Sequence, residues 1–567
     1  MIIKILAAGL AAALVCAPAW AATPINAYRL SPVVEGGKIT ALSITLTLPA
    51  DADGETRLEL PDAWGGGEKL WRFVKDPVVT GGTLSVHDEK TWVVRSKPGA
   101  PLTVRYRVVS AYDGEPPVDS VNYGQPIVGP AGFYVIGHTV FIRPEGRDND
   151  RARFAWDPAG SDLVFASDLE PLIKAPGKLD DLLASVAVAY KDLTILTRQA
   201  AGAPLRLAAR GQFAFTPEAF ADMAAHTIAD SRAFWGDGKE SFLITLTDQD
   251  APKGWTSYRG TGLGDAFAVI STRNVPLDQY KLFLAHEYFH TWNANRLGGS
   301  KSGPQEPAGY WFSEGFTDYY ARRLSLRSGF VSLEAFVKDW NQALQAYGLS
   351  PLRAAPNANI VARFWSDKTV QKLPYHRGAL FAVLMETQLK AKGGLDPVML
   401  AMRDDAKGRD RADWDFAAAN LFPRIAEART GIDVTPELDR YITRGMPIAL
   451  PPDAFGGCLT VETVIRPAYH PGFDEAATRK TRIVTGVVPD GPAWAAGLRD
   501  GQKYLGRAAG QEGDGSVETG QAVEDASGKR VIRYLPAGKT TVGFQRIAMP
   551  MDLTDQARAA CVKAVAG

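Results

Sequence analysis

The chain has 567 residues, with 63 basic and 63 acidic side chains, so its formal net charge at neutral pH is zero, and 46% of its residues are hydrophobic. This composition is typical of folded globular proteins, and because no basic segment dominates, it argues against a nucleic-acid partner and against an anionic membrane surface. The length exceeds what one hydrophobic core usually serves, so we expect several domains.

The first 21 residues have the pattern of an export signal. Lys4 supplies a positive charge, residues 5–15 are apolar, and the segment Ala19-Trp20-Ala21 fits a small-x-small cleavage site. The apolar run is too short to remain as a membrane anchor. We therefore expect a signal peptide at 1–21, export to the periplasm or the medium, and no stable membrane span after cleavage.

Residues 22–203 are predicted to form a β-rich domain. The stretches "KITALSITLTL", "TWVVRS" and "LTVRYRVVSAY" have strand character, and clusters of glycine, proline and aspartate such as "LPDAWGGGEK" separate them. Several short strands at this spacing favour a β-sandwich. Because no group of acids, bases or metal ligands stands out in it, we expect this domain to flank the functional site.

Residues 204–452 carry mostly helical patterns. The stretch "TPEAFADMAAHTIADSRAFWG" predicts a helix capped by Thr216, with Pro217 in its first position, and "SFLITLT" then predicts a strand. Further along the chain, Gly329 is expected to end a helix and Pro374 to begin one.

Residues 453–567 return to strands, glycines and prolines. The segment "RIVTGVVPDGPAWAAGLRDGQ" predicts a strand, a turn and a short helix from Pro492 to Ala496. Without the signal peptide the chain keeps two cysteines, Cys458 and Cys561. In an oxidising compartment an even count favours a disulfide between them, and two buried free thiols are the alternative.

The strongest chemical signal is "LFLAHEYFHTWNANRL", which holds two of the seven histidines in the chain. His286 and His290 are four residues apart, so on a helix both imidazoles can reach one metal ion. Glu287 follows the first histidine, as in the HExxH pattern, where the glutamate is the general base and not a ligand. Asn293 and Arg296 occupy positions where a metzincin would have glycine and histidine, which excludes that class.

A catalytic zinc site needs a third protein ligand and one open position. The second helical pattern, "YWFSEGFTDYYARRL", offers Glu314 for this purpose. Asp318 lies four residues further on, and a carboxylate there can accept the free ring N–H of a ligand histidine, which we expect to be His286. The sequence therefore predicts one Zn²⁺ per chain.

Three motifs, "HEYFHTWNANRL", "YWFSEGFTDYY" and "LPYHRGALFAVLMETQL", closely resemble the bacterial glycyl aminopeptidase family of gluzincin metallopeptidases. The resemblance implies a multidomain α+β protein with an N-terminal β-sandwich, a thermolysin-like, mostly helical catalytic domain and a C-terminal PDZ-like domain. It also implies that His286, His290 and Glu314 bind zinc and that Glu287 is the general base and acid. Tyr375, in "PYHRGA", would donate its phenolic O–H to the oxyanion of the tetrahedral intermediate.

The chain departs from the related enzymes at the strand that edges their cleft. Those enzymes carry a glycine-glycine-leucine-glutamate-histidine stretch there, whereas this chain reads "RGTGLGDAFAVIST". Gly262, Leu263, Gly264 and Asp265 are the corresponding substrate-binding candidates. In aminopeptidases a carboxylate on this strand can hold the free ammonium of the substrate, so we expect Asp265, or a carboxylate elsewhere in the chain, to substitute for the missing glutamate.

The tail resembles PDZ domains in "VTGVVPDGPAWAAGLRDGQ", and the "PGFD" loop, Pro471 to Asp474, would be the site that captures a C-terminal peptide ligand. The leading interpretation is an exported zinc aminopeptidase that acts on short peptides with small N-terminal residues. The alternatives are a zinc endopeptidase with the same chemistry and a non-catalytic, PDZ-containing protein that binds peptides.

Overall fold

The computed structural model describes residues 25–114, 116, 124–250, 255–299, 303–409, 417–510 and 513–567. The predicted signal peptide at 1–21 lies outside these residues. The chain divides into two compact units: the first contains residues up to 195 together with 208–212 and 243–273, and the second contains the remainder. None of the helices described is both long and apolar enough to cross a membrane.

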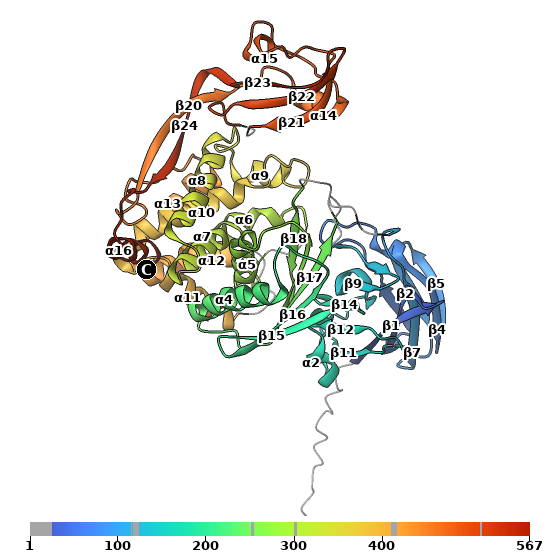
Figure 1. Cartoon of the computed structure of the whole chain (residues 1–567). Coiled ribbons are helices and arrows are strands. Elements are labelled where there is room, and N and C mark those ends of the chain that lie inside the picture. The colour runs from blue at the N-terminus through green and yellow to red at the C-terminus, as the bar shows by residue number, and fades with distance from the viewer. Residues whose placement is uncertain are drawn as a thin grey trace, which may run out of the picture. The chain divides into compact units, whose positions relative to one another are not determined.

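The first unit is built mainly of strands, as predicted for the N-terminal domain (Figure 1). Its N-terminal strands are β1 (Ile25–Glu35), β2 (Lys38–Pro49), β3 (Glu55–Glu59), β4 (Val74–Thr80), β5 (Thr83–Asp88), β6 (Thr91–Arg95), β7 (Pro101–Val108), β8 (Ile127–Gly129), β9 (Gly132–Ile136), β10 (Arg143–Pro144), β11 (Arg151–Trp156), β12 (Val164–Ser167), β13 (Gly177–Lys178) and β14 (Val186–Tyr190). Three short helices connect them: α1 (Gly137–Val140), α2 (Glu170–Lys174) and α3 (Leu179–Leu183).

These strands form three sheets, with the orders β13-β11-β1-β2-β7-β4, β10-β3-β6-β5 and β12-β14-β9-β8. In β2, buried and more exposed residues alternate along most of the strand, which is the period expected when one face of a sheet is covered. The buried side chains of this strand include Ile44 and Leu46, which join Trp92 of β6 and Phe133 of β9 in one hydrophobic core. Side chains from all three sheets therefore share a single core, as in a sandwich.

The boundary of the first unit differs from the prediction at residue 203. The strands β17 (Phe242–Gln249), β18 (Tyr258–Gly262) and β19 (Ala266–Thr272) belong almost entirely to the first unit, although they follow the predicted boundary. The reason is a second core, in which Leu243 and Ala268 pack with Tyr134 and Val188 of the N-terminal strands. The chain passes between the units along β15 (Thr194–Ala200) and β16 (Ala203–Arg210).

Most of the second unit before residue 439 is helical, as predicted for residues 204–452. They are α4 (Pro217–Trp235), α5 (Tyr280–Phe289), α6 (Tyr310–Ser313), α7 (Gly315–Arg327), α8 (Leu333–Leu349), α9 (Asn357–Arg363), α10 (Leu373–Leu389), α11 (Asp396–Lys407), α12 (Ala417–Thr430) and α13 (Thr435–Leu438). The Thr216 hydroxyl accepts a hydrogen bond from Ala219 N at the start of α4, which confirms the predicted cap. Gly329 has a positive φ of 76° just after α7, and Pro374 lies in the first turn of α10, also as predicted.

The C-terminal part of this unit contains strands and short helices: β20 (Thr460–Tyr469), α14 (Glu475–Thr481), α15 (Pro492–Ala495), β21 (Lys503–Ala509), β22 (Thr519–Asp525), β23 (Gly528–Tyr534), β24 (Ala537–Ala548) and α16 (Asp555–Ala566). Strands β20 and β24 pair as an antiparallel ribbon, and residues 470–536 lie between them in the chain (Figure 1). These residues have a core of their own, which includes Phe473, Val523 and Ile532.

Two features of this region differ from the PDZ prediction. The segment after the "PGFD" loop is helix α14, and residues 484–488 form no regular strand, with only an isolated bridge between Ile483 and Lys503. The ends of the predicted domain also pack on the helices: Phe455 contacts Trp340 with ring centroids 5.3 Å apart, and Arg327 Nε of α7 donates to Ala566 O of α16 at 2.7 Å. The predicted domain at 453–567 is therefore not separate from the helical part.

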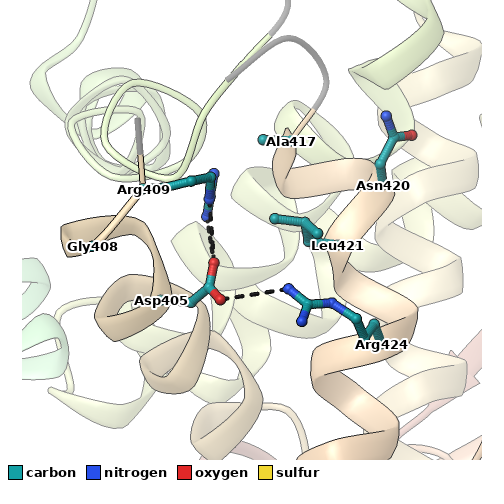
Figure 2. Close-up of a pocket in the computed structure, with 7 residues that line it drawn as sticks. All are labelled: Asp405, Gly408, Arg409, Ala417, Asn420, Leu421 and Arg424. Carbon is teal, nitrogen blue, oxygen red and sulfur yellow. Dashed lines mark hydrogen bonds and ion pairs between the residues drawn. The ribbon is translucent and has the colours of Figure 1, made fainter. Parts of the chain in front are cut away.

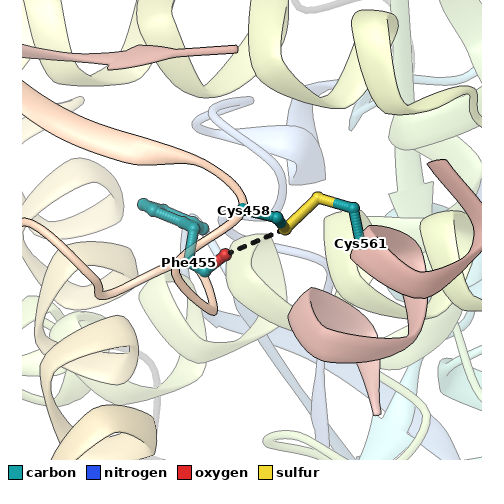
Figure 3. Close-up of a disulfide and its surroundings, with 3 residues drawn as sticks. All are labelled: Phe455, Cys458 and Cys561. Carbon is teal, nitrogen blue, oxygen red and sulfur yellow. Dashed lines mark hydrogen bonds between the residues drawn. A yellow bond between two sulfur atoms is a disulfide. The ribbon is translucent and has the colours of Figure 1, made fainter. Parts of the chain in front are cut away.

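Cys458 and Cys561 are joined by a disulfide (Figure 3). Cys458 precedes the β20–β24 ribbon and Cys561 lies in α16. The disulfide thus connects two segments that pack on the helices, and the inserted residues 470–536 lie within the loop that it closes.

Candidate zinc site

Helix α5 presents both histidines on one face. Leu284, Ala285 and Phe289 are buried, which fixes the rotation of the helix about its axis. His286 lies in the last turn of the helix and His290 immediately after it. Their Nε2 atoms are 3.0 Å apart, so the sequence spacing of four brings the two rings to one point.

The helix ends at Phe289, directly before the second histidine. His290 Nδ1 donates to the carbonyl oxygen of Asn293 at 2.6 Å, and this contact replaces the regular helical geometry at that position. The Asn293 side-chain amide in turn donates to Phe312 O at 3.1 Å and to Thr317 Oγ1 at 3.2 Å. Asn293 therefore orients the His290 ring and also holds the end of α5 against the segment that carries Glu314.

Glu314 lies between helices α6 and α7. Its Oε2 atom is 3.2 Å from His286 Nε2 and 3.4 Å from His290 Nε2. Burial raises the pKa of this carboxyl, but the neighbouring histidines outweigh burial and hold the pKa well below its usual range. The group is therefore a carboxylate, which is the form that binds a metal.

Asp318 lies one turn after Glu314, on α7, and its Oδ1 accepts a hydrogen bond from His286 Nδ1 at 2.9 Å. Arg322 lies one further turn along the helix, with Nη1 at 3.4 Å from Asp318 Oδ2. Burial raises the pKa of Asp318, but the Arg322 guanidinium and the His286 ring outweigh it, and the pKa is well below its usual range. An ionised Asp318 keeps the proton of His286 on Nδ1 and leaves Nε2 as the ligand atom.

The donor set fits a zinc ion. Both Nδ1 atoms donate to oxygen acceptors, so in neutral rings both Nε2 lone pairs face Glu314 Oε2. The three ligand atoms of His286, His290 and Glu314 lie within 4.8 Å of one another, and no other group in the described part of the chain brings three such residues together in this way. A metal ion that replaces the protons at this point would find both Nε2 atoms and the carboxylate directed toward it, and two imidazoles with one carboxylate form a common catalytic zinc set.

Glu287 lies next to these ligands and is buried. Burial raises the pKa of its carboxyl above the ordinary value, and Glu314 acts in the same direction, whereas His286 and His290 oppose it. A carboxyl whose pKa is raised toward neutrality accepts and returns a proton more readily than an exposed one, as a general base and acid must.

Tyr375 comes from a third helix, α10. Its ring stacks on the His286 ring, with centroids 6.0 Å apart and an interplanar angle of 15°. Burial and the carboxylates of Glu314 and Glu287 raise its pKa well above the ordinary value, so the phenol keeps its proton and is a hydrogen-bond donor. A side chain on Gly378 would have its Cβ 1.9 Å from Trp311 O, so α10 approaches α6 as closely as two backbones allow.

The predicted edge-strand residues lie in the first unit. Gly262 is the last residue of β18, while Leu263, Gly264 and Asp265 form the turn before β19 begins at Ala266. These four residues therefore do not lie within one continuous strand, because β18 and β19 pair as an antiparallel hairpin. Asp265 lies in this turn, partly exposed, and its backbone carbonyl accepts a hydrogen bond from Leu243 N at 3.0 Å.

Two residues beside the site were not predicted: Arg322, which contacts Asp318, and Lys372, which contacts the Tyr375 ring. Arg322 could have been found from its spacing, because a cation four residues after Asp318 lies on the same face of a helix. No comparable signal marks Lys372, whose contact depends on how α10 begins.

A different cavity, of about 470 Å³, is lined by residues of α11 and α12 and by the segment after α11, but by none of the predicted ligands (Figure 2). Arg409 and Arg424 both pair with Asp405 in it, at 2.9 and 3.6 Å. Residues 410–416 follow this wall directly and lie outside the described residues, so we assign the cavity no role.

The sequence of the chain matches the M61 glycyl aminopeptidase family over residues 280–366. No curated protein matches it. Its structure is similar to that of an aminopeptidase N family protein from Idiomarina loihiensis, with 15% identity, a TM-score of 0.68, and coverage of 94% of this chain and 99% of that chain. An M1 zinc metallopeptidase from Deinococcus radiodurans gives 16% identity and a TM-score of 0.48, with coverage of 76% and 95%.

The Idiomarina structure shares the fold over nearly the whole chain, and the family match contains the positions of His286, Glu287, His290 and Glu314. The two histidines and Glu314 are also the residues whose ligand atoms converge in the structure. The chain is a zinc metallopeptidase, and its cofactor is Zn²⁺.

Proposed function

We propose that this protein is an exported zinc aminopeptidase that acts on short peptides with small N-terminal residues. The observation that carries the proposal is the convergence of His286 Nε2, His290 Nε2 and Glu314 Oε2, with both histidines oriented through Nδ1. The match to glycyl aminopeptidases over the ligand segment supports aminopeptidase action and a preference for small residues. The fold shared with an aminopeptidase N family protein is consistent with this.

In this proposal His286, His290 and Glu314 hold one zinc ion and leave one position open. When bound there, zinc supplies Lewis acidity, which lowers the pKa of a water in the open position and polarises the carbonyl of the peptide. Glu287 takes a proton from the attacking water and later gives it to the leaving amine. Tyr375 donates its O–H to the carbonyl oxygen as negative charge develops on it.

Recognition of the free N-terminus of a substrate requires a carboxylate. By resemblance to the related enzymes, Asp265 and its chain neighbours Gly262, Leu263 and Gly264 are our candidates for this role. Asp265 comes one position later than the glutamate of the related enzymes. Within a strand, a shift of one residue would turn the side chain to the opposite face, but Asp265 lies in a hairpin turn, where this alternation does not apply.

The competing enzymatic function is a zinc endopeptidase, which would use the same chemistry without binding the N-terminus. The two are distinguished by comparing a short peptide with its N-acetylated form. An aminopeptidase cleaves only the free amine, whereas equal cleavage of both forms supports the endopeptidase. If wild type prefers the free amine and Asp265→Asn loses that preference, Asp265 is the anchor; a preference that survives clears it.

The non-catalytic alternative is a protein that binds peptides through its PDZ-like region. In PDZ domains the ligand adds as a strand beside the carboxylate-binding loop. Helix α14 follows the loop at residues 471–474 here, so the backbone groups of that segment are bonded within a helix. This favours the enzyme, and peptide hydrolysis that a chelator abolishes would rule out the non-catalytic alternative.

Export is supported by the pattern of residues 1–21 and by the disulfide, which persists in oxidising compartments. We place the mature protein in the periplasm or the medium. Mass spectrometry of the protein from a fractionated bacterial host tests this: a mature N-terminus at Ala22 outside the cytoplasm is expected, and an intact Met1 in the cytoplasm would contradict it.

A further inference from the structure

Lys372 immediately precedes α10, the helix that carries Tyr375, and its side chain is exposed. Its ammonium nitrogen lies 4.5 Å from the centroid of the Tyr375 ring. A cation therefore lies beside one of the residues proposed to act on the substrate.

Two other cations of the helical region are less available to a substrate. Arg322 contacts Asp318 and Asp339, and Arg377 is buried, where its Nη2 donates to the carbonyl of Arg353 at 2.9 Å. Lys372 differs, since within the described ranges its Nζ atom has the Tyr375 ring as its contact and forms no ion pair with a carboxylate. An exposed ammonium beside a catalytic site, with no internal anion, is available to an anion on the substrate.

The length of a peptide determines which substrate anion can reach this cation. If the scissile carbonyl accepts from the Tyr375 hydroxyl, the terminal carboxylate of a dipeptide lies about one residue further along, and that of a tripeptide about two. Since a chain spans at most ~3.3–3.6 Å per residue, these carboxylates lie roughly 3.5–7 Å from the reacting carbon. The Lys372 ammonium lies 4.5 Å from the centroid of the same Tyr375 ring, so a carboxylate within that range of the reacting carbon can approach the ammonium.

We propose that Lys372 binds the C-terminal carboxylate of dipeptide and tripeptide substrates. This inference rests on the proposed function and names its substrate class: short peptides with a free C-terminus are favoured over longer or amidated ones. An acidic side chain next to the scissile bond would also offer a carboxylate to Lys372. Substrates that carry only one of these carboxylates distinguish the C-terminus from the side chain. In either case the contact is a solvent-accessible ion pair, so it weakens as salt is added.

The test uses zinc-loaded wild type, Lys372→Met and Lys372→Arg. Alanyl-alanine is compared with alanyl-alaninamide, which lacks the terminal carboxylate. The amides of alanyl-glutamate and alanyl-glutamine are compared to isolate an acidic side chain. Lys368→Met is the matched control, because Lys368 is an exposed lysine in the same loop. We expect Lys372→Met to raise KM for the free dipeptide about two- to fivefold, the range that exposed ion pairs give. KM for the amide should not change, and Lys372→Arg should keep most of the preference.

Binding without turnover gives a second readout. In the Glu287→Gln background, calorimetry with alanyl-alanine should show a loss of affinity of about two- to fivefold on Lys372→Met, and added salt should reduce this loss. If Lys372→Met changes the binding of alanyl-alanine and of alanyl-alaninamide equally, the inference is overturned and Lys372 instead orients Tyr375. A loss confined to the glutamate-containing amide would also overturn it, in favour of side-chain recognition.

The same substrates distinguish a failure of the proposed role of Lys372 from a failure of the proposed aminopeptidase function. If wild type cleaves neither the dipeptide nor its amide but cleaves N-acetylated longer peptides, the aminopeptidase proposal fails. If it cleaves the dipeptide and the amide with equal KM, only the role of Lys372 fails.

Discussion

The carboxylate of Asp318 accepts a hydrogen bond from Nδ1 of His286 at 2.9 Å. Asp318 lies on α7, the helix that directly follows Glu314. A single short segment thus supplies one expected metal ligand and the group that orients another. Because Arg322 fixes Asp318 from the next turn, the orientation of the His286 ring depends on successive contacts along α7.

This relationship predicts that Asp318→Asn weakens zinc binding without removing it. The amide loses the negative charge that holds the proton on Nδ1, and changes to such supporting groups typically lower metal affinity about 10–100-fold. Competition with a fluorescent zinc chelator measures the affinity. Asp339→Asn is the control, since Asp339 pairs with Arg322 and, in the described part of the structure, forms no ion pair with either ligand histidine. An equal loss of affinity in both variants would assign the effect to general weakening of α7.

Tyr375→Phe should lower kcat by about 10²–10³, the usual effect of removing one oxyanion donor, while KM and zinc content change little. The ring that stacks on His286 is retained in this variant, so packing is preserved. Steady-state kinetics with metal analysis on the same sample checks it. If kcat stays close to that of wild type, Tyr375 has only a packing role.

Asp168 gives a prediction about pH and stability. Burial raises the pKa of this carboxyl to about 7, with smaller contributions from Asp265 and Glu170, although it accepts a hydrogen bond from Val186 N at 3.0 Å. The folded protein therefore keeps a proton that the unfolded chain loses near pH 4, so this group lowers stability as pH rises from about 4 to about 7, and the loss is complete above about pH 7.

Asp168→Asn removes this titration and keeps an oxygen acceptor for Val186. The variant should equal wild type in free energy of unfolding near pH 4 and exceed it by roughly 2–4 kcal/mol at about pH 8. Denaturant unfolding at both pH values tests it. Asp162→Asn, at an exposed position paired with Lys191, serves as the control and should show no such gain; an Asp168→Asn variant whose advantage over wild type is the same at both pH values would contradict the assignment.

The disulfide should stabilise the second unit. It joins residues 103 positions apart, and in the chain-entropy model a loop of that length contributes up to about 4–5 kcal/mol. Cys458→Ser with Cys561→Ser should lower Tm, and a reductant should lower the Tm of wild type but not that of the double variant. Two thiols that react under denaturing, non-reducing conditions would show that the bridge is not formed in the isolated protein.

Local patterns predicted much of the site. The spacing of His286 and His290, and the four-residue step from Glu314 to Asp318, are properties of a helix and need no tertiary information. The capping of α4 by Thr216 is equally local. These predictions agree with the structure because the signal and the geometry lie in the same few residues.

What could not be predicted depends on contacts between distant segments. Helix α5 ends at Phe289 because the Asn293 carbonyl turns to His290 while its amide reaches Phe312. The turn at Gly264 is fixed by a hydrogen bond from its N–H to Ala184 O at 3.0 Å, in a segment far earlier in the chain. The spacing of apolar residues also could not show that helix α14, and not a strand, follows the loop at residues 471–474. The segment has only seven residues, and most of them are polar.

The central claim is that His286, His290 and Glu314 together bind the catalytic zinc. The most direct measurement is elemental analysis of wild type, His290→Ala, Glu314→Gln and Glu287→Gln, purified in parallel and dialysed against metal-free buffer. We predict one zinc per chain in wild type and in Glu287→Gln, with hydrolysis in the latter lower by about 10²–10⁴, and a large loss of zinc from the two ligand variants. Undiminished zinc in His290→Ala or in Glu314→Gln would contradict the account.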